Sequence, residues 1–218
     1  MYINRHHRLD DDAALRALVD ANALGTWVRA GPHGVAADHI PFLLDRERGP
    51  HGTLVGHVAR ANPVWRGLDA QAPSLVIFQG PQAYITPNWY PGKAQHGKVV
   101  PTWDYAVVHV HGVARAIEDR DWLLDMLRRL SAVHEAAQPR PWTLDDAPPG
   151  YIDKLLRAIV GIEIAVTRFE GKLKASQDED AQDRAGTVQG LRALGCPNAL
   201  AMAELVELGA QGLGPQAR

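Results

Sequence analysis

The stretch from Leu75 to Gly112 constrains the fold of this 218-residue chain more than any other segment. Two apolar runs, Leu75–Phe78 and Val107–Val110, flank a segment crowded with Pro, Gly and large rings. Rigid rings on connections between strands form a natural wall for a flat ligand, whereas the plainer alternative is a β-barrel with aromatic plugs at its ends. The rings are Tyr84, Trp89, Tyr90, Trp103 and Tyr105.

Turn residues and β-favouring side chains predict that the sheet begins as an antiparallel meander. Strands are expected over Leu24–Ala30, Val35–Asp45 and Thr53–Ala59, with a hairpin turn at residues 31–34. Pro41 cannot donate a hydrogen bond to a neighbouring strand. It therefore indicates that the second strand lies at an edge or contains a bulge.

Further strands are predicted on both sides of the aromatic segment. Ser74–Phe78 and Gln82–Thr86 are expected to be separate strands because Gly80 and Pro81 interrupt them. The run Trp103–Glu118 alternates strictly, and its small apolar face suits the inside of a small barrel. That face holds Val108, Val110, Gly112, Ala114 and Ala116.

Helical periodicity accounts for the rest of the chain, apart from a last strand at Gly161–Phe169. Helices are expected at Asp10–Asn22, Asp121–Ser131, Pro149–Val160, Asp178–Leu194 and Ala199–Leu208. The pattern predicts a mainly-β or α+β fold, a barrel of six or more strands with peripheral helices. We expect a β-rich domain over residues 1–175 and a helical C-terminal extension over residues 176–218.

Composition narrows the classes of function. The formal net charge is −2, which argues against a large non-specific nucleic-acid surface. Cys196 is the single cysteine, so the chain has no internal disulfide and no cysteine-built metal site, and a reducing cytoplasm is the simplest location. No apolar run approaches the roughly 20 residues that span a bilayer, so no membrane partner is expected.

Two segments are candidates for binding an anion. In Gly56–Trp65, GHVARANPVW, a strand gives way to a helical turn, where Arg60, Asn62 and free backbone N–H groups suit a phosphate. The alternative is a solvated Arg60 at a strand end. In Lys172–Gln177, KLKASQ, the lysines suit an anion, but a helix capped by Ser176 explains the segment equally well.

Histidines raise the question of a metal. His109 and His111 lie two apart on a predicted strand and share a side, a spacing that can chelate. Glu118 follows too far behind to complete a His-x-His and Glu set, so we interpret these histidines as satisfied or exposed and expect no metal. The chain also shows no nucleotide-binding fingerprint and no nucleophile–base pair, so no catalytic residue is assigned.

Six segments in order resemble one family, the PaiB-like proteins, known as FMN-binding negative transcriptional regulators. The resemblance runs from Met1 to about Leu194. It implies a split β-barrel of the pyridoxamine-phosphate-oxidase-like class that forms homodimers and binds FMN in clefts at the dimer interface. The segments are DHIPFLLD (38–45), GHVARANPVW (56–65), VIFQGPQAYITPNWY (76–90), VPTWDYAVVHVHGVA (100–114), YIDKLLRAIVGIEI (151–164) and KLKASQ (172–177).

The resemblance implies a set of residues that bind FMN. Arg60, helped by Asn62, would hold the phosphate, the strand around His39 and Pro41 would face the isoalloxazine edge, and aromatic side chains would cap the ring. The full set is His39, Pro41, Arg60, Asn62, Trp89, Tyr90, Trp103, Tyr105, Lys174 and Gln177.

Two positions depart from the family pattern. Asp178 stands where the usual ending KLSQN has an amide, and an acid there would repel a nearby phosphate. Asp104 replaces the Asn of the usual PTWNY motif and changes the charge beside the aromatic wall. A direct ligand role for position 178 is therefore not expected.

Three functions follow as alternatives. The first is an FMN-binding protein with flavin-dependent oxidoreductase activity, in which the flavin supplies the redox chemistry. The second is a transcriptional regulator, although the charge does not support direct DNA binding. The third is a haem-handling protein, because related split barrels bind haem and the chain has ten histidines.

Overall fold

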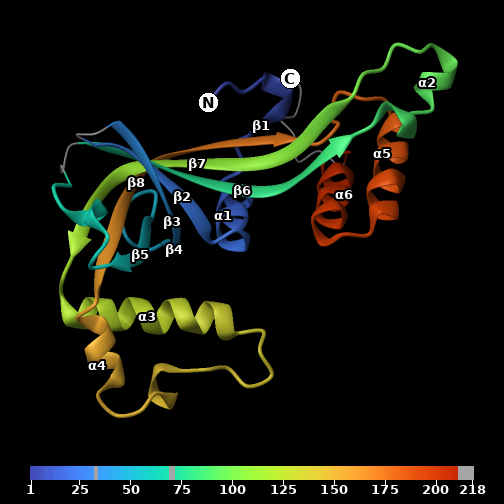
Figure 1. Cartoon of the computed structure of the whole chain (residues 1–218). Helices are drawn as coiled ribbons and strands as arrows, with labels where there is room; N and C mark the ends of the chain where they lie inside the picture. The colour runs from blue at the N-terminus through green and yellow to red at the C-terminus, as the bar shows by residue number, and fades with distance from the viewer. Residues whose placement is uncertain (32–33, 69–71, 211–218) are drawn as a thin grey trace. The chain divides into compact units, whose positions relative to one another are not determined.

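Long antiparallel strands carry the fold. The computed structural model describes residues 1–31, 34–68 and 72–210, and over these residues eight strands hydrogen-bond in the order β3-β2-β6-β7-β8-β5-β4, with β1 paired to β8 (Figure 1). The pairs β2–β3, β2–β6, β4–β5 and β5–β8 are all antiparallel. The strands are β1 Arg8–Leu9, β2 Leu24–Gly31, β3 Gly34–Pro41, β4 Leu43–Asp45, β5 Thr53–Ala59, β6 Pro73–Ile85, β7 Thr102–Ile117 and β8 Ile159–Lys174.

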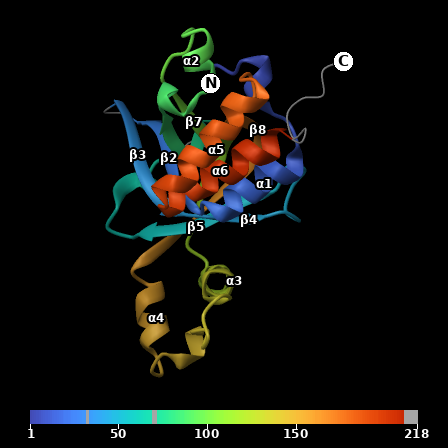
Figure 2. The same ribbon diagram turned by 90° about the vertical axis from the view of Figure 1, so that its right-hand side faces the viewer.

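In the first unit, α5 and α6 run side by side as a hairpin (Figures 1 and 2). None of the helices described is long and apolar enough to cross a bilayer. The α-helices are α1 Asp12–Ala21, α2 Gly92–Gln95, α3 Arg120–Glu135, α4 Tyr151–Leu156, α5 Ala181–Leu194 and α6 Pro197–Ala210. Short 3₁₀ turns are η1 Arg5–His7, η2 Pro63–Trp65, η3 Pro87–Trp89 and η4 Leu144–Asp146.

The chain divides into two compact units that share the three longest strands. The first unit comprises residues 1–22, 78–109 and the chain from residue 170, and the second comprises residues 23–77 and 110–169. Strands β6, β7 and β8 pass through both. The expected boundary between residues 175 and 176 stays a prediction.

Alternation along β7 is as predicted. Val108, Val110 and Ala114 are at most 3% exposed, while His109 and His111 on the opposite face are half-buried. A side chain at Gly112 would meet the carbonyl oxygen of Ala165 and, at 2.7 Å, the Ile164 side chain. The small apolar face therefore lies inside the barrel, where β7 and β8 approach too closely for a Cβ.

The N-terminal strands form two hairpins rather than one meander. β3 pairs with β2, while β4 pairs with β5, and β5 continues onto β8 instead of onto β3. Pro41 ends β3 at one edge of the strand order, which confirms the edge placement. Phe42 connects β3 to β4, and its side chain is buried, with 2% exposed. Its backbone N–H donates to Ala23 O at 2.8 Å. The predicted turn at residues 32–33 lies outside the described residues.

The expected break at Gly80 and Pro81 is wrong, because β6 is one strand of 13 residues. β2 pairs with β6 only at residues 75–77, so Pro81 lies beyond that pairing and loses no ladder hydrogen bond to β2. Gly80 serves packing, since a Cβ there would lie 2.7 Å from the Leu18 side chain of α1. Gly80, which suggested a turn in the sequence, is thus required for the close contact between β6 and α1.

The close approach at Gly112 predicts a specific loss of stability. Gly112→Ala should lower the free energy of unfolding by about 1–3 kcal/mol, because the added methyl group must push β7 from β8. Gly31→Ala is the matched control, since its nearest neighbour would lie at 3.5 Å. Urea unfolding of both variants measures the difference, and equal stabilities would show that the barrel tolerates a wider strand separation.

Candidate functional site

Arg60 is fixed at the end of β5 by the backbone of the α4–β8 connection. Its Nε donates to Arg157 O at 2.9 Å and its Nη2 donates to Ile159 O at 3.1 Å. Its Nη1 donates to the Glu118 carboxylate at 2.5 Å. A guanidinium has five N–H groups, so two remain for a further acceptor.

Asp38 of β3, which precedes the predicted His39, bonds the turn that follows β5. Asn62 Nδ2 donates to the Asp38 carboxylate at 2.8 Å, and Asn62 Oδ1 accepts from Val64 N–H at 2.9 Å, as the N-cap of η2. The predicted His39 instead contacts β2, with its Nδ1 3.0 Å from Thr26 Oγ1. The side chain of Asn62 therefore ties the turn after β5 to β3.

Trp65 is a site candidate that the sequence reasoning missed. The guanidinium carbons of Arg60 and Arg66 lie 5.7 and 5.3 Å from its ring centroid, within cation–π range. Its indole N–H donates to Arg60 O at 3.1 Å. Trp65 closes the GHVARANPVW motif, so its position within that motif was the available signal.

A cavity of about 410 Å³ opens beside Arg60 in the second unit. Its size falls within the roughly 300–1,000 Å³ of small-molecule sites. Three arginines and two acids line it over a floor of Leu123 and Leu156, so it suits a ligand with an anionic end. The charged lining residues are Arg60, Glu118, Arg120, Asp153 and Arg157.

Lys174 and Asp104 form a buried ion pair in the first unit. The Asp104 carboxylate, 0% exposed, accepts from Ser176 Oγ at 2.6 Å and from Lys174 Nζ at 3.2 Å. Lys174 also donates to Thr102 Oγ1 at 2.7 Å and to Trp103 O at 3.0 Å. Burial raises the pKa of Asp104, while the bonds from Ser176 and Lys174 oppose that shift.

Ser176 and Gln177 shape the turn after β8. The expected N-cap role of Ser176 is wrong, because Asp180 caps α5 through the N–H groups of Gln182 and Asp183. Ser176 has a left-handed backbone conformation with φ of 54°. Its hydroxyl donates to the Asp104 carboxylate. Gln177 Oε1 accepts from Ala175 N–H and its Nε2 donates to Leu173 O, both at 2.6 Å.

The aromatic side chains fall into an accessible group and a packed group. Trp103, 54% exposed, meets Tyr84 edge-to-face with ring centroids 6.1 Å apart. Lys172 Nζ lies 5.1 Å from the ring centroid of the half-buried Tyr105. Trp103 and Tyr105 therefore keep surface that a flat ligand could contact.

Trp89 and Tyr90 are built into the packing of the η3 turn. Any side chain at Gly190 of α5 would collide with the Trp89 indole, so the helix lies directly against that ring. Tyr90 is 3% exposed, and burial raises the pKa of its hydroxyl to about 12. In this arrangement both rings hold the loop to α5.

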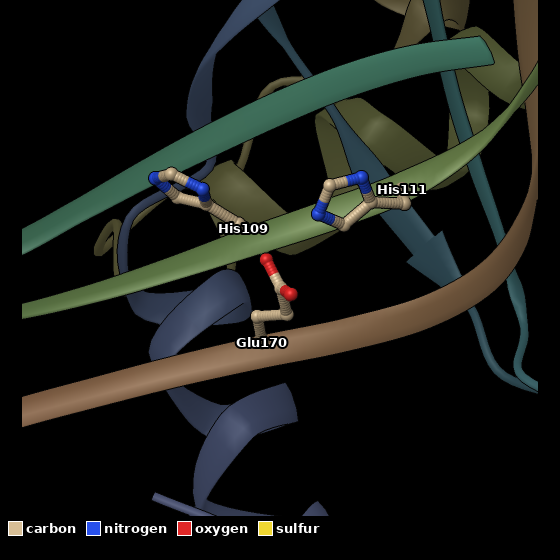
Figure 3. A group of neighbouring side chains, drawn as sticks. All are labelled: His109, His111 and Glu170. Atoms are coloured by element: carbon tan, nitrogen blue, oxygen red, sulfur yellow. The ribbon is translucent and has the colours of Figure 1, made fainter. Parts of the chain in front are cut away.

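The histidine pair does not make a convincing metal centre. Figure 3 shows His109 and His111 on β7 and Glu170 on β8. Candidate ligand atoms of His109 and Glu170 lie within 4.8 Å of each other in the first unit. In the second unit, Arg168 Nη2 lies 3.3 Å from His111 Nδ1, and a neighbouring cation disfavours a bound cation. The haem alternative gains no support here.

Comparison with solved structures identifies the fold. The flavocytochrome Anf3 from Azotobacter vinelandii matches with a TM-score of 0.60 at 14% identity, over 84% of this chain and 78% of that one. The FAD and haem binding protein from Mycobacterium smegmatis matches with a TM-score of 0.56 at 20% identity, over 82% of this chain and 79% of that one. The antiparallel sheet and these likenesses confirm the expected split β-barrel fold with peripheral helices.

Sequence comparison then gives the family. The family model described as a putative FMN-binding domain matches residues 1–168. Protease synthase and sporulation protein PAI 2 of Bacillus subtilis is 32% identical over 207 residues, which cover 95% of this chain and 97% of that protein. The chain belongs to this FMN-binding family, which confirms the expected PaiB-like protein and FMN as its cofactor.

The raised pKa of Asp104 predicts how stability depends on pH. The folded state holds this proton more tightly than the unfolded state, so the contribution of Asp104 to stability falls as pH rises from the ordinary value of 3.8 through the raised pKa. Relative to Asp104→Asn, which cannot ionise, the wild type should therefore lose stability as the pH rises above about 4. Urea unfolding across this range measures the difference.

The exposed Asp145 is the matched control for removing one carboxylate. Asp145→Asn should not show the same pH-dependent difference from the wild type. A difference between the wild type and Asp104→Asn that is constant with pH would show that burial of Asp104 is fully compensated by Lys174 and Ser176.

Proposed function

We propose that the cavity beside Arg60 receives the phosphate end of FMN. The observation that carries this is the rigid placement of the Arg60 guanidinium, held on two backbone carbonyls at the rim of a cavity that Arg157 also lines. A preorganised fork of N–H donors suits a phosphate better than a flexible ammonium does. The residues present therefore fit the charged end of the cofactor.

Neighbouring residues in the second unit support the same placement. Asn62 ties the turn to β3, so the backbone around His39 and Pro41 is held close to the residues that carry Arg60. Trp65 adds an indole face next to the cation. In the proposal the backbone around His39 and Pro41 hydrogen-bonds the polar edge of the isoalloxazine ring. The turn after β5 holds the phosphate.

The aromatic wall is the part of the proposal that rests on the family resemblance alone. Within the first unit, Trp103 and Tyr105 keep accessible ring surface, and Lys174 donates to the Trp103 carbonyl oxygen. Trp89 and Tyr90 hold the η3 turn to α5, and Gln177 bonds the chain at the end of β8. FMN supplies redox chemistry when bound, and the chain's residues bind it and orient it. No side chain is assigned as an acid or a base.

Arg60→Ala should weaken FMN binding roughly 10- to 100-fold, because a charge-assisted bond to the phosphate is lost. Flavin fluorescence quenching measures the affinity, and thermal unfolding checks that the variant remains folded. Arg66→Ala is the matched control, since it removes another cation beside Trp65 that does not line the cavity, and it should change affinity less than about 3-fold. Equal effects of the two substitutions would rule out a specific anchor at Arg60.

A homodimer is part of the proposal, because the exposed rings need a partner surface to enclose a ligand. Tyr84 and Trp103 are 48% and 54% exposed and meet edge-to-face, so together they offer a partner chain an apolar contact surface. Sedimentation equilibrium should give twice the chain mass of 23.8 kDa. Trp103→Glu should shift the equilibrium towards monomer, whereas a wild-type monomer at micromolar concentration would contradict this part of the proposal.

A role in regulating transcription rests on the family label, and a cytoplasmic location rests on the cysteine content. The net charge of −2 gives direct DNA binding no support. In this proposal a regulatory signal is carried by the flavin state or the dimer, not by a basic surface. A mobility shift that weakens steeply with salt is the result that would instead establish phosphate contacts to DNA.

A further inference from the structure

The Glu118 carboxylate lies where an incoming anion would meet Arg60. We propose that it is an internal stand-in for the FMN phosphate, which displaces it on binding, so that Glu118 sets the affinity and selectivity of the site for phosphate-bearing flavins. This inference rests on the proposed function and concerns the same cavity. It assigns to Glu118 and Arg157 roles that their positions in the sequence do not suggest.

The first argument is the difference between the three partners of Arg60. The carbonyl oxygens of Arg157 and Ile159 belong to the backbone and hold two edges of the guanidinium in place. The third partner, Glu118, is a flexible side chain that is 56% exposed. An acceptor entering the cavity therefore meets a fixed cation and can replace only the carboxylate.

The second argument is that Glu118 is weakly held. In the part of the chain that the structure describes, its carboxylate has one partner, Arg60. Glu118 lies in the two-residue connection between β7 and α3, where Asp119 rather than Glu118 caps the helix. A change of Glu118 rotamer thus breaks one exposed ion pair and no cap, which costs little free energy.

The third argument is the state of the other cations that line the cavity. Arg120 is already paired, donating to Asp121 at 2.9 Å and to Asp153 at 2.6 Å. The Arg157 guanidinium, in contrast, makes no hydrogen bond or ion pair with any described residue, and its backbone carbonyl is what holds Arg60. Arg157 is therefore the cation available to join Arg60 on a phosphate.

Charge explains why the phosphate replaces Glu118 rather than binding beside it. With Glu118 in place, the cavity lining carries three positive and two negative side chains. A dianion brought next to the carboxylate would meet a like charge at close range, which is unfavourable at any effective dielectric. Once Glu118 turns outward, the same dianion faces Arg60 and Arg157 without that repulsion.

The test compares FMN with riboflavin, which has the same ring and no phosphate. Glu118→Gln removes the competing charge and keeps the shape, so it should tighten FMN binding about 3- to 20-fold and leave riboflavin binding unchanged. Arg157→Ala should weaken FMN binding about 3- to 10-fold, again without an effect on riboflavin. Fluorescence quenching titrations give all four affinities.

Asp145→Asn is the matched control for removing one carboxylate, because Asp145 is exposed in the same unit and does not line the cavity. It should change FMN affinity less than about 2-fold. An equal tightening by Asp145→Asn, or a tightening of riboflavin by Glu118→Gln, would overturn the stand-in role while FMN binding itself stands. If the wild type binds FMN no better than riboflavin, the phosphate site of the proposed function fails together with this inference.

Discussion

Contact between strand backbones at two glycines shapes the second unit and places its site. A side chain at Gly56 of β5 would lie 2.8 Å from the Pro41 carbonyl oxygen of β3, and one at Gly112 would meet the backbone of β8. Strands this close exclude any Cβ between them, so the barrel curvature depends on both positions. The end of β5, and with it Arg60, is therefore placed by the packing of the barrel.

That placement links the fold to its function. Arg60 bonds the carbonyl oxygens of the connection into β8, so the cation is a structural tie as well as a candidate ligand. A tie of this kind is preorganised, and preorganised donors lose little entropy when an anion arrives. The family gives FMN as the cofactor, and in the proposal Arg60, held by these bonds, is the cation for its phosphate.

Helices and strands with a regular hydrophobic pattern could be predicted from the sequence, because that pattern indicates which face is buried. The alternation of β7 and the strand Thr53–Ala59 match the expectation, whereas Gly80 and Pro81 suggested a break that packing against α1 overrides. Contacts between residues far apart in the sequence could not be predicted from it. Glu118 lies 58 residues from Arg60, and no local pattern announces their pairing.

The same limit applies to the buried network of the first unit. Asp104 and Ser176 are 72 residues apart. The sequence marked Asp104 only as a departure from the family motif and Ser176 only as a helix cap. The structure shows that the acid at position 104 is buried and bonded to Lys174 and Ser176. The motifs marked these segments from the sequence, and only the three-dimensional contacts show what each side chain bonds there.

An experimental structure of the chain with FMN bound is the most direct measurement of the central claim. The account predicts a phosphate oxygen within hydrogen-bonding distance of the Arg60 guanidinium, with the Glu118 carboxylate turned away from it. A phosphate held by Lys172 and Lys174, with Arg60 still bonded to Glu118, would contradict it.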